Sequence, residues 1–211
     1  MMRRAFAAVM LAVILMTGCS ENYTPDETGS EAVRYDTESE TVYEDIVTDE
    51  DDGMTIEVEL GSYVFSYDET CWELSERQDG SKTVDLSYKL PKDQMLEVMI
   101  SSDARGSLDE VAGIYEGNIN MITKFDEGIH GEFGGMPAYI ADGVPIGEDD
   151  KDCATKLITA QPEGTQDVLV ICMRYSFPKG EKNEQALEDA QAVLDSCMPM
   201  SERIKNGKVV L

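Results

Sequence analysis

Between residues 54 and 211 the chain is a succession of short apolar stretches, each closed by turn-forming residues. Residues 56–60 alternate apolar and acidic side chains, which is the period-two pattern of a half-buried strand. Residues 78–81, Gln-Asp-Gly-Ser, are a hairpin turn signal. The same reasoning predicts strands at residues 56–60, 63–67, 71–74, 83–90, 95–101, 131–133, 137–144, 153–160 and 168–177. Their hairpin-like spacing favours antiparallel pairing.

A first helix is predicted after the fifth of these strands. Ser107 and Glu110 form a capping box, and apolar residues follow at intervals of three and four as far as Phe125. We therefore expect a helix of about five turns that ends before residue 126. Gly113 and Gly117 weaken this helix by about 1 kcal/mol each relative to Ala. They would also allow another element to pack closely.

A second helix is predicted near the end of the chain. Asn183 can cap it, and Pro199 stops it. Its apolar face is formed by Leu187, Ala190, Val193, Leu194 and Cys197. The order of strands, helix, strands and helix predicts an α+β domain over residues 54–211, with an antiparallel sheet flanked by two main helices.

The segment before this domain is strongly acidic. Residues 20–53 hold thirteen Asp and Glu side chains against Arg34 alone. Low hydrophobicity with high like charge predicts a disordered, extended linker over residues 19–53, with a reach of about 30 Å. Capture of cations or of a basic partner by this linker is the alternative. Residues 54–211 are acidic too, with thirty Asp and Glu against fourteen Lys and Arg, so no nucleic-acid partner is expected.

Residues 1–18 have the features of an export signal. Two arginines precede an apolar run from Ala5 to Met16, which is shorter than the roughly 20 residues needed to span a bilayer. Leu15-Met16-Thr17-Gly18-Cys19 resembles the lipobox of bacterial lipoproteins. The resemblance implies cleavage before Cys19, a diacylglycerol on its thiol, and usually a further acyl group such as palmitate on the new amino terminus. It also implies a lipid-anchored location at the extracytoplasmic face of the cell membrane. An ordinary secretory signal followed by a cysteine is the alternative.

The domain itself resembles the PsbP-like superfamily. The resemblance rests on a strand-rich start, on Leu108-Asp109-Glu110-Val111 opening a helix, on residues 134–139 (Gly-Gly-Met-Pro-Ala-Tyr), and on a long apolar hairpin followed by a last helix. It covers roughly residues 56–198. It implies a central antiparallel sheet flanked by helices and a role in binding or assembly. It implies no catalytic residues and no metal ligands.

Four cysteines fall in the domain, and an exported protein permits disulfides. If residues 161–164 close a symmetric hairpin, Cys153 and Cys172 face each other, so Cys153–Cys172 and Cys71–Cys197 are the candidate disulfides. A single bulged residue would shift this register. Buried free thiols that pack as small apolar side chains are the alternative. No CxxC motif is present.

Other candidate sites are weaker. His130 is the single histidine, which excludes a multi-histidine zinc site, and it is expected to be an exposed loop residue. The acidic loop at residues 148–152 lacks the spacing of an EF-hand and is expected to be solvated rather than a calcium site. Glu57 and Glu59 alternate on a strand and are expected to face water. Seven aromatic residues are numerous enough to line a ligand groove, although most are expected in the core: Tyr63, Tyr67, Trp72, Tyr88, Tyr115, Tyr139 and Tyr175.

From these features we expect a membrane-anchored, extracytoplasmic lipoprotein that is not an enzyme and has no cofactor. It would act as a binding or assembly module for an envelope protein or a small ligand. A metal-binding or small-ligand carrier and a small hydrolase using acidic residues are the alternatives. A hydrolase would need a carboxyl group of raised pKa in a cleft.

Overall fold

Short strands dominate the computed structural model, which describes residues 43–45, 55–77 and 81–205. These residues belong to one of the two units of the chain, Ser39–Leu211. The strands are β1 (Tyr43–Asp45), β2 (Thr55–Leu60), β3 (Tyr63–Asp68), β4 (Trp72–Glu76), β5 (Thr83–Tyr88), β6 (Met95–Asp103), β7 (Thr123–Phe125), β8 (Ile129–Phe133), β9 (Met136–Pro145), β10 (Lys151–Ala160), β11 (Val168–Pro178) and β12 (Met198–Pro199). The helices are α1 (Leu108–Ile119), α2 (Glu184–Ser196) and α3 (Met200–Lys205). The predicted α+β class is confirmed.

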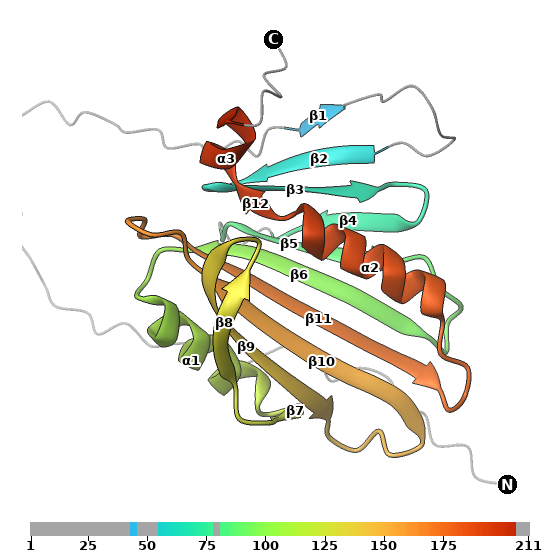
Figure 1. The fold of residues 1–211 in the computed structure, drawn as a ribbon. Helices are drawn as coiled ribbons and strands as arrows, with labels where there is room; N and C mark the ends of the chain where they lie inside the picture. The colour runs from blue at the N-terminus through green and yellow to red at the C-terminus, as the bar shows by residue number, and fades with distance from the viewer. Residues whose placement is uncertain (1–42, 46–54, 78–80, 206–211) are drawn as a thin grey trace, which may run out of the picture. The chain divides into compact units, whose positions relative to one another are not determined.

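The strands form two antiparallel sheets (Figure 1). The large sheet has the order β4-β5-β6-β11-β10-β9-β7, and β8 also pairs with β9. The small sheet has the order β1-β2-β3-β12. All the strands predicted from the sequence are present, with bounds shifted by a few residues at the ends. Residues 78–80 of the turn predicted at residues 78–81 lie outside the described residues.

Strand β1 was not predicted. It falls within the predicted linker, where Tyr43–Asp45 pair with Ile56, Glu57 and Val58 of β2. An unpaired sheet edge offers free N–H and C=O groups, so a short extended segment can add to it despite its acidic composition. The rest of the predicted linker and the predicted signal peptide lie outside the described residues.

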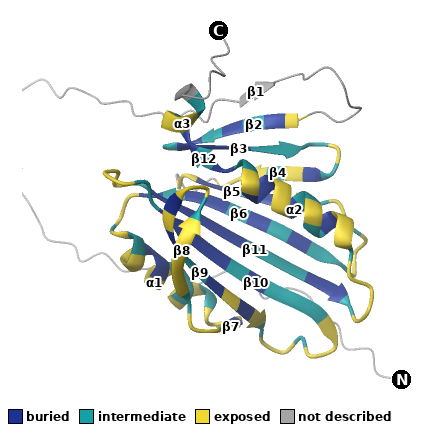
Figure 2. Ribbon diagram, in the orientation of Figure 1, coloured by how far each residue is buried: buried dark blue, intermediate teal, exposed yellow. Residues whose placement is uncertain are grey.

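Strand β11 lies in the middle of the large sheet, and both of its faces are buried. Leu169 and Ile171 point to one face and join a core with the small sheet and α2. Val168, Val170 and Cys172 point to the other face and join a second core under α1. Figure 2 shows the buried residues running along β6, β11 and β10. The large sheet is therefore a middle layer, with the small sheet and α2 over one face and α1 over part of the other.

Helix α1 is shorter than predicted. Its start is confirmed, since the Ser107 N–H donates to Glu110 Oε2 at 2.8 Å. It ends at Ile119, and the predicted last turns are replaced by β7, in which Phe125 pairs with Gly143 of β9. Residues 123–125 therefore pair with the edge of the sheet, although their apolar periodicity favours a helix. Nothing lies within 4 Å of a Cβ built at Gly113 or Gly117, so no other described element uses the close approach that these glycines would allow.

The C-terminal end of the described chain holds two short elements that were not predicted, β12 and α3. Helix α2 is confirmed, with Asn183 accepting the Ala186 N–H at 3.1 Å. After it, β12 pairs with β3, and α3 brings Arg203 against the face of β2 that points away from the core. Arg203 pairs with Glu57, and it donates to Glu59 at 2.8 Å. The prediction that these two glutamates simply face water is therefore wrong.

Candidate functional site

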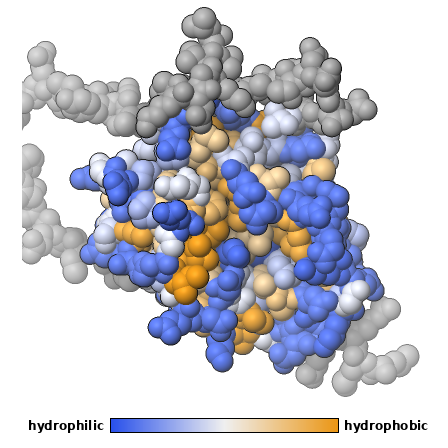
Figure 3. All heavy atoms as spheres, in the orientation of Figure 1, coloured by the Kyte–Doolittle hydropathy of each residue, from blue (hydrophilic) through white to orange (hydrophobic). Residues whose placement is uncertain are grey.

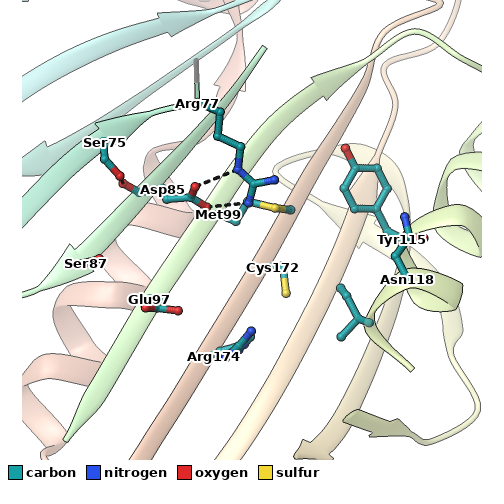
Figure 4. A pocket seen from close by; sticks show the side chains of 11 residues that line it. Ser75, Arg77, Asp85, Ser87, Glu97, Met99, Tyr115, Asn118, Cys172 and Arg174 are labelled. Atoms are coloured by element: carbon teal, nitrogen blue, oxygen red, sulfur yellow. Dashed lines mark hydrogen bonds and ion pairs between the residues drawn. The ribbon is translucent and has the colours of Figure 1, made fainter. Parts of the chain in front are cut away.

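A groove lies on the face of the large sheet that α1 covers only in part. Its volume is about 520 Å³, within the 300–1,000 Å³ typical of ligand sites. Strands β4, β5, β6 and β11 form its floor, and α1 forms one wall (Figure 4). Successive side chains of a strand point to opposite faces of the sheet. Every second residue of β6 and β11 therefore faces the groove, and the residues between them belong to the core shared with the small sheet. The lining residues are Ser75, Arg77, Asp85, Ser87, Glu97, Met99, Tyr115, Asn118, Ile119, Cys172 and Arg174.

Arg77 and Asp85 form a two-point ion pair at one end of the groove. Arg77 Nε donates to Asp85 Oδ2 at 2.9 Å, and Nη2 donates to Oδ1 at 3.0 Å. This fork geometry fixes both side chains more firmly than a single contact would. The pair neutralises itself, so it shapes the groove without contributing net charge.

Arg174 and Glu97 lie farther along the floor, on neighbouring strands. They are register partners between β11 and β6, and both side chains are half-buried. Figure 4 shows them near each other, below the Arg77–Asp85 pair, with no interaction drawn between them. Within the described part of the chain, no ion pair or hydrogen bond joins either side chain to a partner. The other three described arginines all pair with carboxylates.

The apolar part of the groove comes from β6, β11 and α1. Met99, Ile119 and Tyr115 pack against the second core and face the groove. Tyr115 is held in place because its hydroxyl donates to Ser101 Oγ at 3.2 Å and the Arg105 guanidinium lies 6.0 Å from its ring centroid. The groove thus combines an apolar wall with two opposite charges.

Cys172 lies in the groove floor but is 6% exposed. Burial raises the pKa of its thiol to about 11, so the thiol is protonated at neutral pH. A thiolate is the nucleophilic form of cysteine, and active cysteines have lowered rather than raised pKa values. Cys172 is therefore a packing residue.

The predicted hairpin register is wrong. Cys153 faces Ser176 and Cys172 faces Leu157, a shift of four residues. The connection between β10 and β11 is longer than a four-residue turn, because Ala160 and Leu169 are the last paired residues. Asp167 in this connection is held by the small sheet, where Ser62 donates to its carboxylate and the Tyr63 hydroxyl donates to its carbonyl at 2.5 Å.

All four domain cysteines are free thiols in the structure: Cys71, Cys153, Cys172 and Cys197. Four residues along a strand separate Cys153 from the position facing Cys172, a distance of about 13 Å. A disulfide needs Cα atoms less than about 7 Å apart, so the Cys153–Cys172 bridge is excluded in this arrangement. Cys197 is 2% exposed, and burial raises the pKa of its thiol to about 12. It packs as a small apolar side chain.

The acidic loop and His130 do not form a site together. Glu148 pairs with Lys151 at 3.5 Å and accepts the Ser176 hydroxyl at 2.5 Å, while Asp152 accepts the Gly180 N–H at 2.7 Å. Within the described residues no group of His, Cys, Asp and Glu side chains has the arrangement of a metal site. His130 is exposed, as predicted, but it lies on β8 rather than in a loop.

Six of the seven predicted aromatic residues lie in the core, against it, or in the groove. Tyr139 lies in none of these places, since its ring is 5.5 Å from that of His130 and its hydroxyl donates to Glu116 Oε1 at 3.1 Å. Tyr63 and Trp72 are buried in the core shared with the small sheet, and Tyr67, Tyr88 and Tyr175 pack against that core. Tyr115 is the member of the set that lines the groove. Sequence reasoning missed the charged lining altogether. One signal for it existed, since Arg174 interrupts the otherwise apolar run of β11.

An apolar surface patch lies away from the groove. Figure 3 shows apolar surface over β8 and β9 on the face that it presents. The exposed large apolar residues are Ile114, Met121, Ile122, Ile129, Val144 and Ile146. Ile122 and Ile146 are adjacent, because the Ile146 N–H donates to the Ile122 carbonyl at 2.8 Å.

Cys19 lies outside the described residues, so the predicted lipid attachment stays a prediction. Among the residues that the structure does describe, no helix is long and apolar enough to cross a membrane.

Comparison with known proteins assigns no family to this chain. No family model matches the chain, and no curated protein matches it. Among solved structures, LpqN of Mycobacterium tuberculosis, described as involved in cell envelope biogenesis, has a TM-score of 0.42 at 14% identity and covers 75% of this chain and 90% of its own. The cyanobacterial PsbP (CyanoP) of Synechocystis sp. PCC 6803 has a TM-score of 0.41 at 13% identity and covers 65% of this chain and 86% of its own. The second belongs to the family that the sequence pattern resembles, but neither likeness is close enough to transfer a function.

Proposed function

We propose that this chain is a lipid-anchored binding protein of the cell envelope that holds a small ligand in the groove of its large sheet. The observation that carries the proposal is the groove itself. Its floor is a sheet buried on its opposite face, so the backbone of the lining residues has a fixed position before a ligand arrives. Preformed position lowers the entropy lost on binding.

Two features favour binding over catalysis in this groove. Its one thiol, Cys172, has a raised pKa and is not a nucleophile. One of its two carboxylates, Asp85, already accepts two hydrogen bonds from Arg77 and is therefore not free to act on a substrate. The lipobox-like residues before Cys19 support location at the membrane.

Ligand binding in the groove is tested by thermal unfolding of the full chain with a panel of metal ions, metabolites and cell-wall fragments. Trp72, the single tryptophan, is 2% exposed and reports unfolding by fluorescence. A ligand at 100 times its Kd stabilises by about 2.7 kcal/mol, which is roughly 5–10 °C for a domain of this size. We expect Ser87→Trp, which fills the groove, to abolish the shift.

The control for that experiment is Ser201→Trp, at an exposed position on α3 away from the groove. It should keep the full shift. A panel without any shift, or a shift that survives Ser87→Trp, would show that the groove is not the binding site.

Lipid attachment is tested by metabolic labelling with radioactive palmitate in a bacterial host. We expect the chain to take up label and Cys19→Ser to lose it completely, because the thiol is the attachment point implied by the lipobox. Cys71→Ser, at a half-buried cysteine of the folded domain, should keep the label. Label that persists in Cys19→Ser would contradict lipidation at this residue.

A further inference from the structure

The charges in the groove indicate which class of ligand it takes. This inference rests on the proposed function. Arg77 and Asp85 satisfy each other, which leaves Arg174 and Glu97 as the charges available to a ligand. One is positive, the other is negative, and they are direct register partners on adjacent strands. Opposite residues of an antiparallel pair have Cβ atoms about 4.5–5.5 Å apart.

The charges of the domain and of the groove together disfavour a ligand that carries a single charge. Residues 54–211 hold thirty Asp and Glu against fourteen Lys and Arg, so a simple anion is repelled by the field of the whole domain. A simple cation would be attracted by that field, but in the groove it would meet Arg174 beside Glu97. A molecule with one positive and one negative group has no net charge for the domain to repel, and its positive group can lie beside Glu97 while its negative group lies beside Arg174.

We propose that the groove binds an α-amino acid with an apolar side chain. Its carboxylate would accept hydrogen bonds from the Arg174 guanidinium, and its ammonium group would donate to Glu97. These two ligand groups are attached to one carbon, which matches the adjacent placement of the protein charges. The apolar side chain would lie against Met99, Ile119 and the ring of Tyr115.

Direct pairing of Glu97 with Arg174 does not oppose this proposal strongly. Such a contact would be a partly solvated cross-strand pair, a class with small stabilising effects. A ligand that engages both groups replaces one weak contact with two charge-assisted hydrogen-bonded contacts. The large sheet offers a matched pair for comparison, since Lys156 and Asp142 are register partners between β10 and β9 with an ion pair at 3.5 Å. They point to the opposite face of the sheet from the groove.

The test is calorimetric titration of the full chain with L-leucine and two analogues of the same apolar body. One analogue, 4-methylpentanoate, lacks the ammonium group, and the other, 3-methylbutylamine, lacks the carboxylate. We expect L-leucine to bind and each analogue to bind at least tenfold more weakly. Arg174→Gln should weaken L-leucine binding tenfold or more. Glu97→Gln should weaken L-leucine binding but leave 4-methylpentanoate binding unchanged.

The matched controls are Lys156→Gln and Asp142→Asn, which remove the same charges from the other face of the sheet and should leave L-leucine binding unchanged. Equal binding of L-leucine and 4-methylpentanoate would overturn the amino-acid proposal in favour of a simple anion site. Failure of L-leucine, L-phenylalanine and L-valine to bind, while a panel compound still gives a shift that Ser87→Trp abolishes, would overturn this inference and leave the proposed function standing. Failure of both experiments would overturn both.

Discussion

Gly61→Ala is expected to destabilise the protein by about 3 kcal/mol. Gly61 forms the turn between β2 and β3 with φ of +62°, a conformation that costs an L-residue roughly 1–2 kcal/mol. A Cβ built there would lie 2.4 Å from Ser102 Oγ and 2.7 Å from Ser102 Cβ on β6. Contacts this short force the small sheet away from the large one, and overpacking of this kind costs about 1–3 kcal/mol. At about 2–4 °C per kcal/mol, the Tm should fall by roughly 6–12 °C.

Gly164→Ala is the matched control for this prediction. Gly164 has a similar φ of +76°, but nothing lies within 4 Å of a Cβ built on it. It should show the conformational cost alone, about 1 kcal/mol. The measurement is urea unfolding followed by Trp72 fluorescence. Equal losses in the two variants would contradict the close packing of this turn on β6.

Arg105→Ala is expected to cost about 2 kcal/mol at pH 7, and the cost should shrink in acid. The Asp103 side chain is 5% exposed and accepts from Arg105 Nε at 3.0 Å and from Nη2 at 2.6 Å. Hydrogen bonds to the Arg105 guanidinium lower the pKa of Asp103 below its ordinary value. Removing the guanidinium leaves a buried carboxylate without its charged partner, and hydrogen bonds to charged groups contribute about 1.5–3 kcal/mol.

The pH dependence follows from the direction of the pKa shift. A carboxyl whose pKa is lower in the folded state stabilises the fold above its unfolded pKa of about 3.9, and this stabilisation is lost as the pH falls through the folded value. The difference between the native chain and Arg105→Ala should therefore be largest near pH 7 and decrease below about pH 4. Urea midpoints at pH 7 and pH 3 measure it. A difference that stays constant would mean that Arg105 acts through its contact with Tyr115.

A control for the Arg105 prediction is Arg77→Ala. The Arg77–Asp85 pair has a similar two-point geometry, but its side chains are 44% and 37% exposed. Exposed pairs contribute about 0–1 kcal/mol, so this variant should change stability little at either pH. Comparison of the two variants separates the effect of burial from that of pairing.

The strands were predictable because their signals are local. Alternation in residues 56–60 and the apolar runs of β10 and β11 determine which residues face a core, whatever the partner strand. Helix α2 was predictable for the same reason, since Asn183 and the apolar stripe lie within one segment. The ends of α1 and the position of β1 depend on an edge offered by distant strands, which no local pattern contains.

The groove was not predictable because pairing across the sheet creates it. Glu97 and Arg174 are 77 positions apart in the sequence, and the β6–β11 register brings them together. The predicted hairpin register of β10 and β11 was wrong for a related reason. The contacts of Asp167 with Ser62 and Tyr63 of the small sheet lengthen the connection, and a symmetric-turn argument does not contain them.

The layering of the domain bears on how the protein should be handled in a binding assay. Strand β1 belongs to the small sheet, which packs on the face of the large sheet opposite to the groove. A sensor chip or bead coupled at β1 therefore attaches to the domain from the side of the small sheet. Attachment at this point should leave the groove open to solution.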